Sequence, residues 1–325
     1  MEILSGANNW KLVVRREAAG AEILWAATCD TRAALPEELF GLPVTALGDH
    51  ALTPGRPMPK GETVLVTCGP VADDAAWDNS RLEDLGLPES LLRVGDYGLL
   101  NCRMLRTLRL WDTTLCWGGG ALMNCRSLER FHVTCTGREG ELLSYFAGEL
   151  SHELDMTLRL PAGDTARLIL PEYVEIYEEN CPAHHFDYNI YGAGYGYHHC
   201  FYRRKLNLKA YDELWRSMLG MEHDEDCAMR LAWWRLWYPA ELSEQAERDY
   251  LAYLQANVLS AARWLLAERN TEGLRFLLEH TGWTREELSE ACELARQAGF
   301  PEAVALLLEE RHRRFPTGMG KRFEL

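Results

Sequence analysis

Cysteine and histidine residues gather in one segment of the chain, and these side chains are the ones best suited to chemistry. Thiolate sulfur and imidazole nitrogen are the ligands that zinc prefers in proteins. Their order does not follow a well-defined zinc-finger spacing, and two adjacent histidines reach one ion only through a special turn. A zinc site is therefore an alternative interpretation, with no ligand assigned. Its candidates would be Cys181, His184, His185, His198, His199 and Cys200.

Two other activities could be placed in the same segment. The glycine-rich stretch 192–196 could form a phosphate-binding loop, but no Lys-Ser or Lys-Thr pair follows it. A nucleophilic Cys200 would need His184 or His185 beside it, which spacing alone does not predict. We favour an ordered connector in which glycines permit tight turns and tyrosines provide packing. The packing tyrosines would be Tyr191, Tyr195, Tyr197 and Tyr202. No catalytic residue and no cofactor is predicted.

The composition narrows the classes of partner. With 325 residues, of which 47% are apolar, the chain has enough material for about two domains with full cores. The formal net charge is −15, and the only basic cluster is Arg311, Arg313 and Arg314, so nucleic acid is not expected to be the main partner. The longest apolar run, Ala303 to Leu308, is far shorter than the roughly 20 residues of a membrane helix. Met1 to Trp10 lacks the pattern of a secretory signal, so the ten cysteines are expected to be reduced thiols in the cytoplasm.

A repeat of 23 residues occupies the front half of the chain. The segment Gly95–Leu110 recurs as Gly118–Val133, with an Asn-Cys-Arg turn in both copies. The apolar positions follow an L-x-x-L-x-L pattern, which predicts that each repeat adds one strand to a parallel sheet. Three copies have this pattern, at Leu82, Leu85 and Leu87, at Leu105, Leu108 and Leu110, and at Leu128, Phe131 and Val133. The asparagine is expected to satisfy backbone groups in the turn, and Cys102 and Cys125 are expected to be structural residues of the repeat.

The strand residues that point away from the core form the predicted binding face. Side chains alternate along a strand, so each of the last two repeats contributes three such residues. They are Thr107, Arg109, Trp111, Arg130, His132 and Thr134. Tryptophan and arginine are favoured anchors of protein interfaces, so we predict partner binding by Arg109, Trp111, Arg130 and His132. Packing of Trp111 beneath a loop of the next segment is an equal alternative.

Four further motifs accompany the repeat. They are Leu35–Glu37, Gly41–Ala51, Leu87–Ser90 and Val94–Tyr97. With these motifs and the two Asn-Cys-Arg turns, residues 20–134 resemble the BspA-type leucine-rich repeat family of bacterial proteins. The resemblance implies recognition of other proteins or surfaces. Its best-known members are exported, whereas no export signal is predicted here. The stretch from Thr53 to Ser80 breaks the period, so a short and irregular array is expected.

The pattern changes twice in the second half of the chain. Met156–Leu160 and Arg167–Leu170 are predicted strands that extend or cap the sheet, as terminal repeats require. From about residue 209 the apolar spacing becomes helical, and a period of 30 residues aligns Ala261 with Ala291. Each unit reads as helix, short break, helix. Residues 291–309 look like ankyrin-repeat helices, although the Thr-Pro-Leu-His signature is missing and the period is shorter than usual.

These observations predict an α+β chain in three parts. The parts are a short leucine-rich-repeat sheet array (1–134), a sheet cap with a Gly/Tyr-rich connector (135–206) and an all-α domain of ankyrin-like helical hairpins (207–325). We expect a non-enzymatic, cytoplasmic scaffold or adaptor that binds another protein, and neither nucleic acid nor a membrane. The alternatives are a zinc-binding or catalytic module centred on residues 181–200, and a surface adhesin exported by an unrecognised route.

Overall fold

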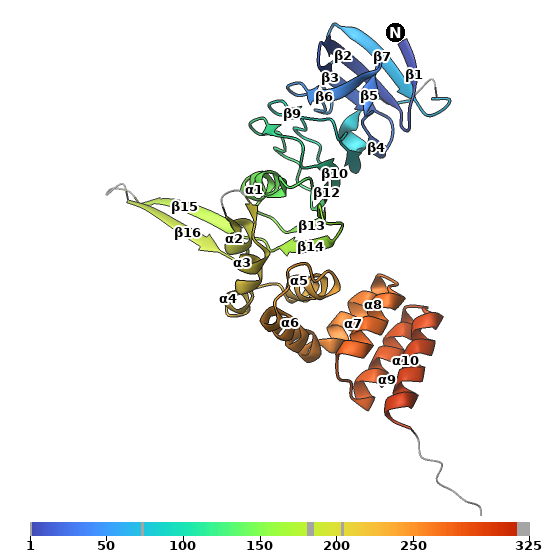
Figure 1. Cartoon of the computed structure of the whole chain (residues 1–325), viewed down its shortest axis with the longest axis vertical. Coiled ribbons are helices and arrows are strands. Elements are labelled where there is room, and N and C mark those ends of the chain that lie inside the picture. Colours follow the sequence, from blue (N-terminus) through green and yellow to red (C-terminus); the bar gives the residue numbers. More distant parts are fainter. Residues whose placement is uncertain (1, 73–74, 181–184, 203–204, 317–325) are drawn as a thin grey trace, which may run out of the picture. The chain divides into compact units, whose positions relative to one another are not determined.

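The computed structural model describes residues 2–72, 75–180, 185–202 and 205–316 (Figure 1). It is mixed α+β, with sheets concentrated in the first half and helices in the second, which confirms the predicted fold class. The chain divides into two compact units, Met1–His223 and Asp224–Leu325. Because this division falls after His223, the first unit contains all of segment 135–206 and the short helices that follow it.

Two sheets make up most of the first unit. Sheet A contains, in spatial order, β1 (Glu2–Ser5), β7 (Glu62–Thr67), β2 (Trp10–Glu17), β3 (Gly20–Thr28), β6 (Leu42–Leu47), β9 (Arg93–Val94) and β11 (Cys116–Trp117), with β5 (Glu38–Leu39) paired to β6. Sheet B contains β14 (Thr165–Leu170), β13 (Leu154–Arg159), β12 (Arg130–Thr134), β10 (Thr107–Trp111), β8 (Asp84–Gly86) and β4 (Arg32–Ala34).

The 23-residue repeat builds both sheets at once. In sheet B, Leu85, Leu108 and Phe131 lie in register on neighbouring parallel strands, and all three are fully buried. This confirms the predicted parallel strand in each repeat. The first two copies also contribute a second strand each to sheet A, where Arg93 of β9 pairs with Cys116 of β11, whereas the third copy is followed by a helix. The sequence pattern did not predict this second strand, because two residues are too few to show an alternation.

The irregular stretch from Thr53 to Ser80 leaves the array of repeats. It contains β7, which crosses to the far edge of sheet A and pairs there with β1 in parallel and with β2 in antiparallel orientation. The short 3-10 helix Asn79–Arg81 then brings the chain back. The buried amide of Asn79 secures this return, since it accepts from the Thr28 N–H at 3.1 Å and donates to the Ala26 and Leu52 carbonyls.

A helix and two strands cover the last repeat, which contains β12. Strand β13 runs parallel to β12, and β14 runs antiparallel to β13, which confirms that both predicted strands extend the sheet. Helix α1 (Glu139–Glu149) places Phe146 on Phe131, with ring centroids 4.6 Å apart. The rest of the unit consists of the hairpin β15 (Val174–Asn180) and β16 (His185–Tyr191), α2 (Gly194–His198), β17 (Phe201–Tyr202), β18 (Lys205–Leu206), α3 (Leu208–Glu213) and α4 (Trp215–Leu219).

The second unit is helical. Its helices are α5 (Glu225–Trp237), α6 (Glu244–Ala256), α7 (Val258–Ala267), α8 (Thr271–His280), α9 (Arg285–Gln297) and α10 (Pro301–Arg314). Helix α7 packs against α9, and α8 packs against α10, so the period of 30 residues corresponds to two stacked hairpins. Trp233 is fully buried against Trp264 and Phe276 and so belongs to the core of this unit. Pro301 begins α10 at its first position, where its missing N–H needs no partner.

Candidate functional site

The four predicted binding residues lie on one face of sheet B. Arg109 and Trp111 belong to β10, Arg130 and His132 belong to β12, and Arg109 is directly in register with His132. Their side chains point to solvent because the alternate residues of both strands, such as Leu108, are buried between the sheets. The predicted orientation is therefore confirmed. No observation on these strands tests whether the face binds a partner.

The outer face of sheet B is wider than the sequence indicated. Its strand register brings residues of six strands into three rows. The first row contains Arg32, Asp84, Thr107, Arg130, Asp155 and Ile169, of which Thr107 and Ile169 are buried. The second contains Ala34, Gly86, Arg109, His132, Thr157 and Arg167, and the third contains Trp111, Thr134, Arg159 and Thr165. Five arginines and two aspartates thus share one face of a chain whose formal net charge is −15.

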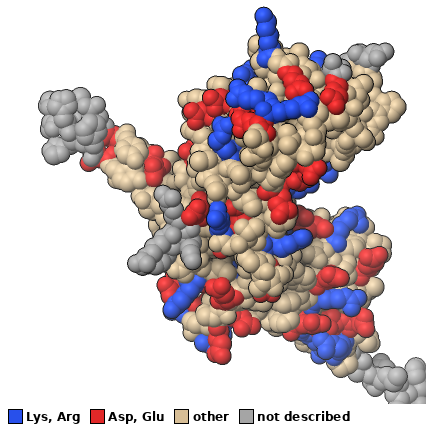
Figure 2. All heavy atoms as spheres, turned by 45° about the horizontal axis from the view of Figure 1, so that its top comes forward, with Lys and Arg blue, Asp and Glu red and all other residues tan. Residues whose placement is uncertain are grey.

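Figure 2 draws one face of the molecule, on which lysine and arginine side chains lie beside aspartate and glutamate side chains.

A groove crosses the second and third rows of this face. Its volume is about 360 Å³, at the lower end of the range for ligand-binding pockets. Arg109, Trp111 and His132 line it, whereas Arg130 does not. Trp111 is only half-buried, and its place in the wall of the groove favours the exposed interpretation over packing beneath a loop.

Small residues give the groove its depth at one end. Gly86 and Ala34 lie side by side there, and a Cβ atom on Gly86 would come within 2.9 Å of the Ala34 Cβ. A larger residue at position 86 would therefore collide with its neighbour and fill the groove.

Two of the arginines are held by carboxylates of the same face, and Arg130 forms a longer ion pair, of 3.6 Å, with its neighbour Glu129. Arg109 Nε donates to Asp84 Oδ1 at 2.8 Å, and Arg167 donates to both oxygens of Asp155, at 2.7 and 2.5 Å. A two-pronged contact of the second kind fixes the plane of the guanidinium group. Arg159, in contrast, is exposed and forms no ion pair with any residue that the structure describes.

The histidine of the face is surrounded by these pairs. Partial burial lowers the pKa of His132, and the positive charges of Arg167 and Arg109 lower it further. The carboxylates of Asp155 and Asp84 act in the opposite direction. Since the net shift is downward, His132 is mainly neutral at physiological pH and offers one N–H donor and one acceptor nitrogen.

The described residues among the cysteines and histidines proposed for zinc do not form a common site. Cys181, His184 and the side chain of His185 lie outside the described residues. The ring nitrogens of His198 are 3.0 Å from the Ala147 and Pro171 carbonyls, and His199 Nδ1 lies 2.7 Å from the Tyr195 carbonyl. Two of the six candidates are thus bound to backbone oxygens.

A nucleophilic role of Cys200 is equally unsupported. The side chain is buried, and burial raises the pKa of its thiol to about 12. A thiol with such a pKa is protonated at neutral pH and is a poor nucleophile. Its proposed partners His184 and His185 are outside the region for which side chains are described.

The glycine-rich stretch is explained by close packing of the backbone. A Cβ atom on Gly194 would lie only 1.9 Å from the Pro171 carbonyl oxygen, so no other residue fits there. Tyr197 is fully buried with its ring 4.8 Å from that of Tyr211, as expected of an ordered connector. Tyr191, however, is 55% exposed, so its predicted packing is wrong, and the side chain of Tyr202 lies outside the described residues.

The repeat cysteines have structural surroundings. Cys102 and Cys125 are buried, and their sulfur atoms lie 3.5 and 3.2 Å from the Leu52 and Leu99 carbonyls of preceding turns. Burial raises the pKa of Cys125 to about 12. Both residues therefore pack as neutral thiols, which confirms the prediction.

One other group has the composition of a metal site. Asp112, Cys135 and Glu139 place one ligand atom each within 4.8 Å of one another, and they are the one such set among the described residues. Both oxygens of Asp112 already accept hydrogen bonds, from the Thr136 N–H and hydroxyl and from the Arg138 N–H. This carboxylate orders the turn into α1 and is satisfied without an ion, whereas Glu139 Oε2 is buried without a hydrogen-bond partner among the described residues.

Sequence reasoning missed the part of the face contributed by β13 and β14. Arg159, Thr157 and Thr165 all line the groove beside Trp111. The signal was present, because Met156 and Leu158 alternate with polar residues and predict which side chains face outward. The same alternation that identified Arg109 would have identified Arg159.

Comparison with known proteins gives no further guide. No family model matches the chain, and neither a curated protein nor a solved structure with significant similarity was found. In the part of the chain that the structure describes, no helix is both long and apolar enough to cross a membrane.

Proposed function

We propose that this chain is a non-enzymatic scaffold or adaptor that binds another protein through the outer face of sheet B. The observation that carries the proposal is the groove of about 360 Å³ that Arg109, Trp111 and His132 line together. Half-buried tryptophan and arginine side chains around a groove are the usual anchors of an interface. The resemblance of residues 20–134 to BspA-type repeats and the ankyrin-like hairpins of the second unit support the same class. We further propose that it acts in the cytoplasm.

The face is suited to recognition because it is not needed to hold the sheet together. The strands of sheet B are joined through their main chains, and their inward side chains form the core. Outward side chains that take no part in the cross-strand pairs Arg109–Asp84 and Arg167–Asp155 are therefore free to vary with the partner. Function of this kind depends on the site and not on the fold, so the partner has to be found by experiment.

The test is an affinity purification from native cell extract, with the metal content of the same sample measured in parallel. We expect a stoichiometric protein partner that is lost from the double variant Arg109→Ala, Trp111→Ala. A matched control is Arg126→Ala, Met123→Ala, which removes one exposed arginine and one exposed apolar side chain from the turn. Retention of the partner by both variants would disprove the sheet face as the binding site. Near one zinc per chain without a partner would instead favour residues 181–200.

A further inference from the structure

We propose that the groove on the outer face of sheet B binds an extended, acidic segment of the partner protein, with Arg159 as the residue that receives its carboxylate. This inference rests on the proposed function and adds the chemistry of the ligand. It starts from the charges of the groove, its hydrogen-bond donors and its length.

Charge gives the first argument. Of the arginines in the second and third rows, Arg109 and Arg167 already share Asp84 and Asp155. Arg159 lies in the groove wall without an ion pair to any described residue, so its charge is available to a ligand. A guanidinium group binds a carboxylate through two parallel N–H···O bonds, which is stronger and more selective than contact with a neutral group.

The surrounding hydroxyl groups give the second argument. Thr134, Thr157 and Thr165 line the groove around Arg159, and their hydroxyls form no hydrogen bond within the described chain. Each can donate to a carboxylate oxygen or to a peptide carbonyl. Neutral His132 adds a further N–H donor. The donors around Arg159 are matched to a ligand with several oxygen acceptors.

Length gives the third argument. The groove crosses five strands from Gly86 of β8 to Thr165 of β14. Since neighbouring strands are about 4.8 Å apart, the groove spans about 19 Å, which is the length of about six residues of extended chain. Trp111 provides a flat apolar surface beside it. A peptide strand fits this shape better than a small, compact ligand does.

The same observations argue against a nucleic acid in the groove. Asp84 and Asp155 lie in the face, and Glu37 lines the groove, so a continuous row of phosphates would meet carboxylates along its length. The net charge of −15 repels a long polyanion in addition. A short acidic segment whose carboxylate binds Arg159 interacts mainly with charges within about 8 Å of it.

The experiment measures fluorescence anisotropy with the full chain and a labelled synthetic peptide that carries a central run of glutamates. The companion probe is the same peptide with glutamines. We expect the glutamate peptide to bind, with an affinity that falls as salt is added, and the glutamine peptide to bind much more weakly. Arg159→Ala should weaken binding of the glutamate peptide about tenfold or more, since one charged hydrogen-bonded pair is lost.

Control variants separate a local contact from a change in net charge or folding. Arg126→Ala removes the same charge from an exposed turn, and binding should be unchanged. Arg159→Lys keeps the charge but loses the two-pronged contact, so it should restore binding only in part. Thermal unfolding of each variant checks that the sheet is intact.

Several results would overturn the inference. Equal binding of the two peptides, an unchanged affinity of Arg159→Ala, or tighter binding of inorganic polyphosphate through the same arginine would each do so. Self-association of the chain that is lost in Arg159→Ala would assign the groove to a second copy. If the natural partner is lost in the Arg109, Trp111 double variant while the glutamate peptide does not bind, the proposed function stands and only the ligand chemistry is wrong.

Discussion

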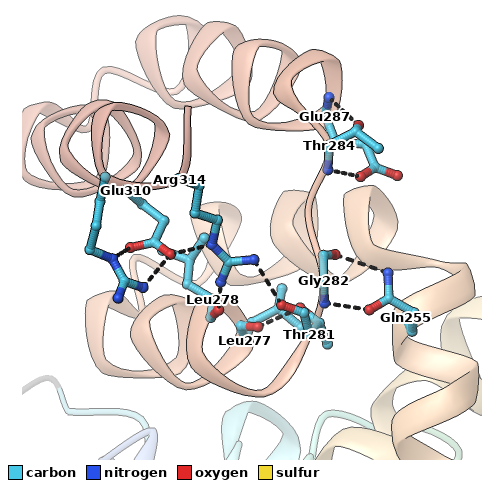
Figure 3. A network of polar contacts seen from close by, with 10 residues as sticks. Gln255, Leu277, Leu278, Thr281, Gly282, Thr284, Glu287, Glu310 and Arg314 are labelled. Carbon is cyan, nitrogen blue, oxygen red and sulfur yellow. Dashed lines mark hydrogen bonds and ion pairs between the residues drawn. The ribbon is translucent and has the colours of Figure 1, made fainter. Parts of the chain in front are cut away.

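Neighbouring repeats are joined by a different balance of main-chain and side-chain contacts in the two units. In the first unit the repeats are linked mainly by main-chain hydrogen bonds between parallel strands and between turns. An example is the bond from Leu99 N–H to the Ala121 carbonyl at 2.9 Å. In the second unit the linking groups include side chains. Gln255 of α6 donates to the Gly282 carbonyl at 2.9 Å and accepts from the Gly282 N–H (Figure 3).

Polar side chains therefore have different roles in the two units. In the first unit the main-chain bonds of the parallel strands join the repeats, and side-chain bonds such as those from Asn124 to Asn101 and from Arg109 to Asp84 add to them. Among the described residues, Arg159 on the candidate binding face takes part in no ion pair. In the helical unit, side chains such as Gln255 and Arg314 satisfy backbone groups of other elements. The comparison teaches that an exposed arginine on sheet B and a half-buried arginine on α10 should respond differently to substitution.

The largest effect is expected on the inward side of β12. Phe131→Ala removes a fully buried ring that stacks on Phe146, and it should lower the free energy of unfolding by about 3–5 kcal/mol. His132→Ala, one residue later and facing outward, should cost less than about 0.5 kcal/mol. Urea unfolding followed by circular dichroism measures both. A large cost for His132→Ala would show that the outer face is structural and would break the comparison.

The next largest loss of stability is expected at the end of α10. Arg314 donates to the Thr281 carbonyl at 3.2 Å, to the Leu278 carbonyl and to Glu310 Oε1 at 2.5 Å (Figure 3). Arg314→Ala should cost about 2–3 kcal/mol, because carbonyls at the end of α8 lose their donor.

Arg313 is the matched control for Arg314. It binds the same carboxylate of Glu310, but its side chain is 67% exposed and reaches no backbone carbonyl among the described residues. Arg313→Ala should cost at most about 1 kcal/mol, as is usual for exposed ion pairs. Equal losses of unfolding free energy in the two variants would mean that the ion pair, and not the backbone carbonyls, accounts for the stabilisation.

A smaller effect is expected in the turns of the first unit. Asn101 and Asn124 both have positive φ, at 64° and 62°, and Asn124 Nδ2 donates to Asn101 Oδ1 at 3.0 Å. Asn101→Ala should cost about 2 kcal/mol, since alanine adopts this backbone conformation poorly and the side-chain bond is lost.

Asn101→Gly distinguishes the two causes. Glycine tolerates the positive φ, so only the side-chain hydrogen bond is lost and the cost should fall to about 1 kcal/mol. Thermal or urea unfolding of the two variants gives the difference. If glycine costs as much as alanine, the strain of the turn contributes nothing and the asparagine ladder accounts for the whole effect.

The sequence predicted the parts of the fold that depend on strict periodicity. The spacing of Leu108, Leu110 and Phe131 fixed the inward and outward sides of β10 and β12, and the period of 30 residues gave the stacked hairpins. Side chains of both sheets and helices obey such a period wherever one side is buried. For the same reason the outward orientation of Arg109 and Trp111 was predictable.

Long-range pairing was not predictable in this way. Strand β7 lies in the sequence between β6 and β8, yet it pairs with β1 and β2 at the opposite edge of sheet A. Nothing local to Glu62–Thr67 encodes that partner, because any half-buried strand has the same alternation. The groove was missed for a related reason: it forms only when β13 adds Arg159 to the face that β10 and β12 begin.

The smallest changes in stability are expected at two equivalent positions of the 30-residue repeat in the helical unit. Arg269 and Gly299 are 30 residues apart, each follows the end of a helix, and their φ angles are 52° and 59°. Glycine is the usual residue at such a helix end. Gly299→Ala should therefore cost about 1 kcal/mol, since a Cβ atom is strained at positive φ.

Arg269→Gly should change the free energy of unfolding by less than about 0.5 kcal/mol, because relief of strain is offset in two ways. The unfolded chain gains entropy with glycine, and the folded chain loses the contacts of the Arg269 guanidinium with the Phe300 ring, 5.4 Å from its centroid, and with the Ala298 carbonyl, 3.5 Å away. Urea unfolding of both variants provides the test. A loss above about 1 kcal/mol for Arg269→Gly would mean that these contacts, like those of Arg314, stabilise the joining of neighbouring hairpins. That result would sharpen the contrast with sheet B, where main-chain bonds join the repeats and Arg159 is left for the partner.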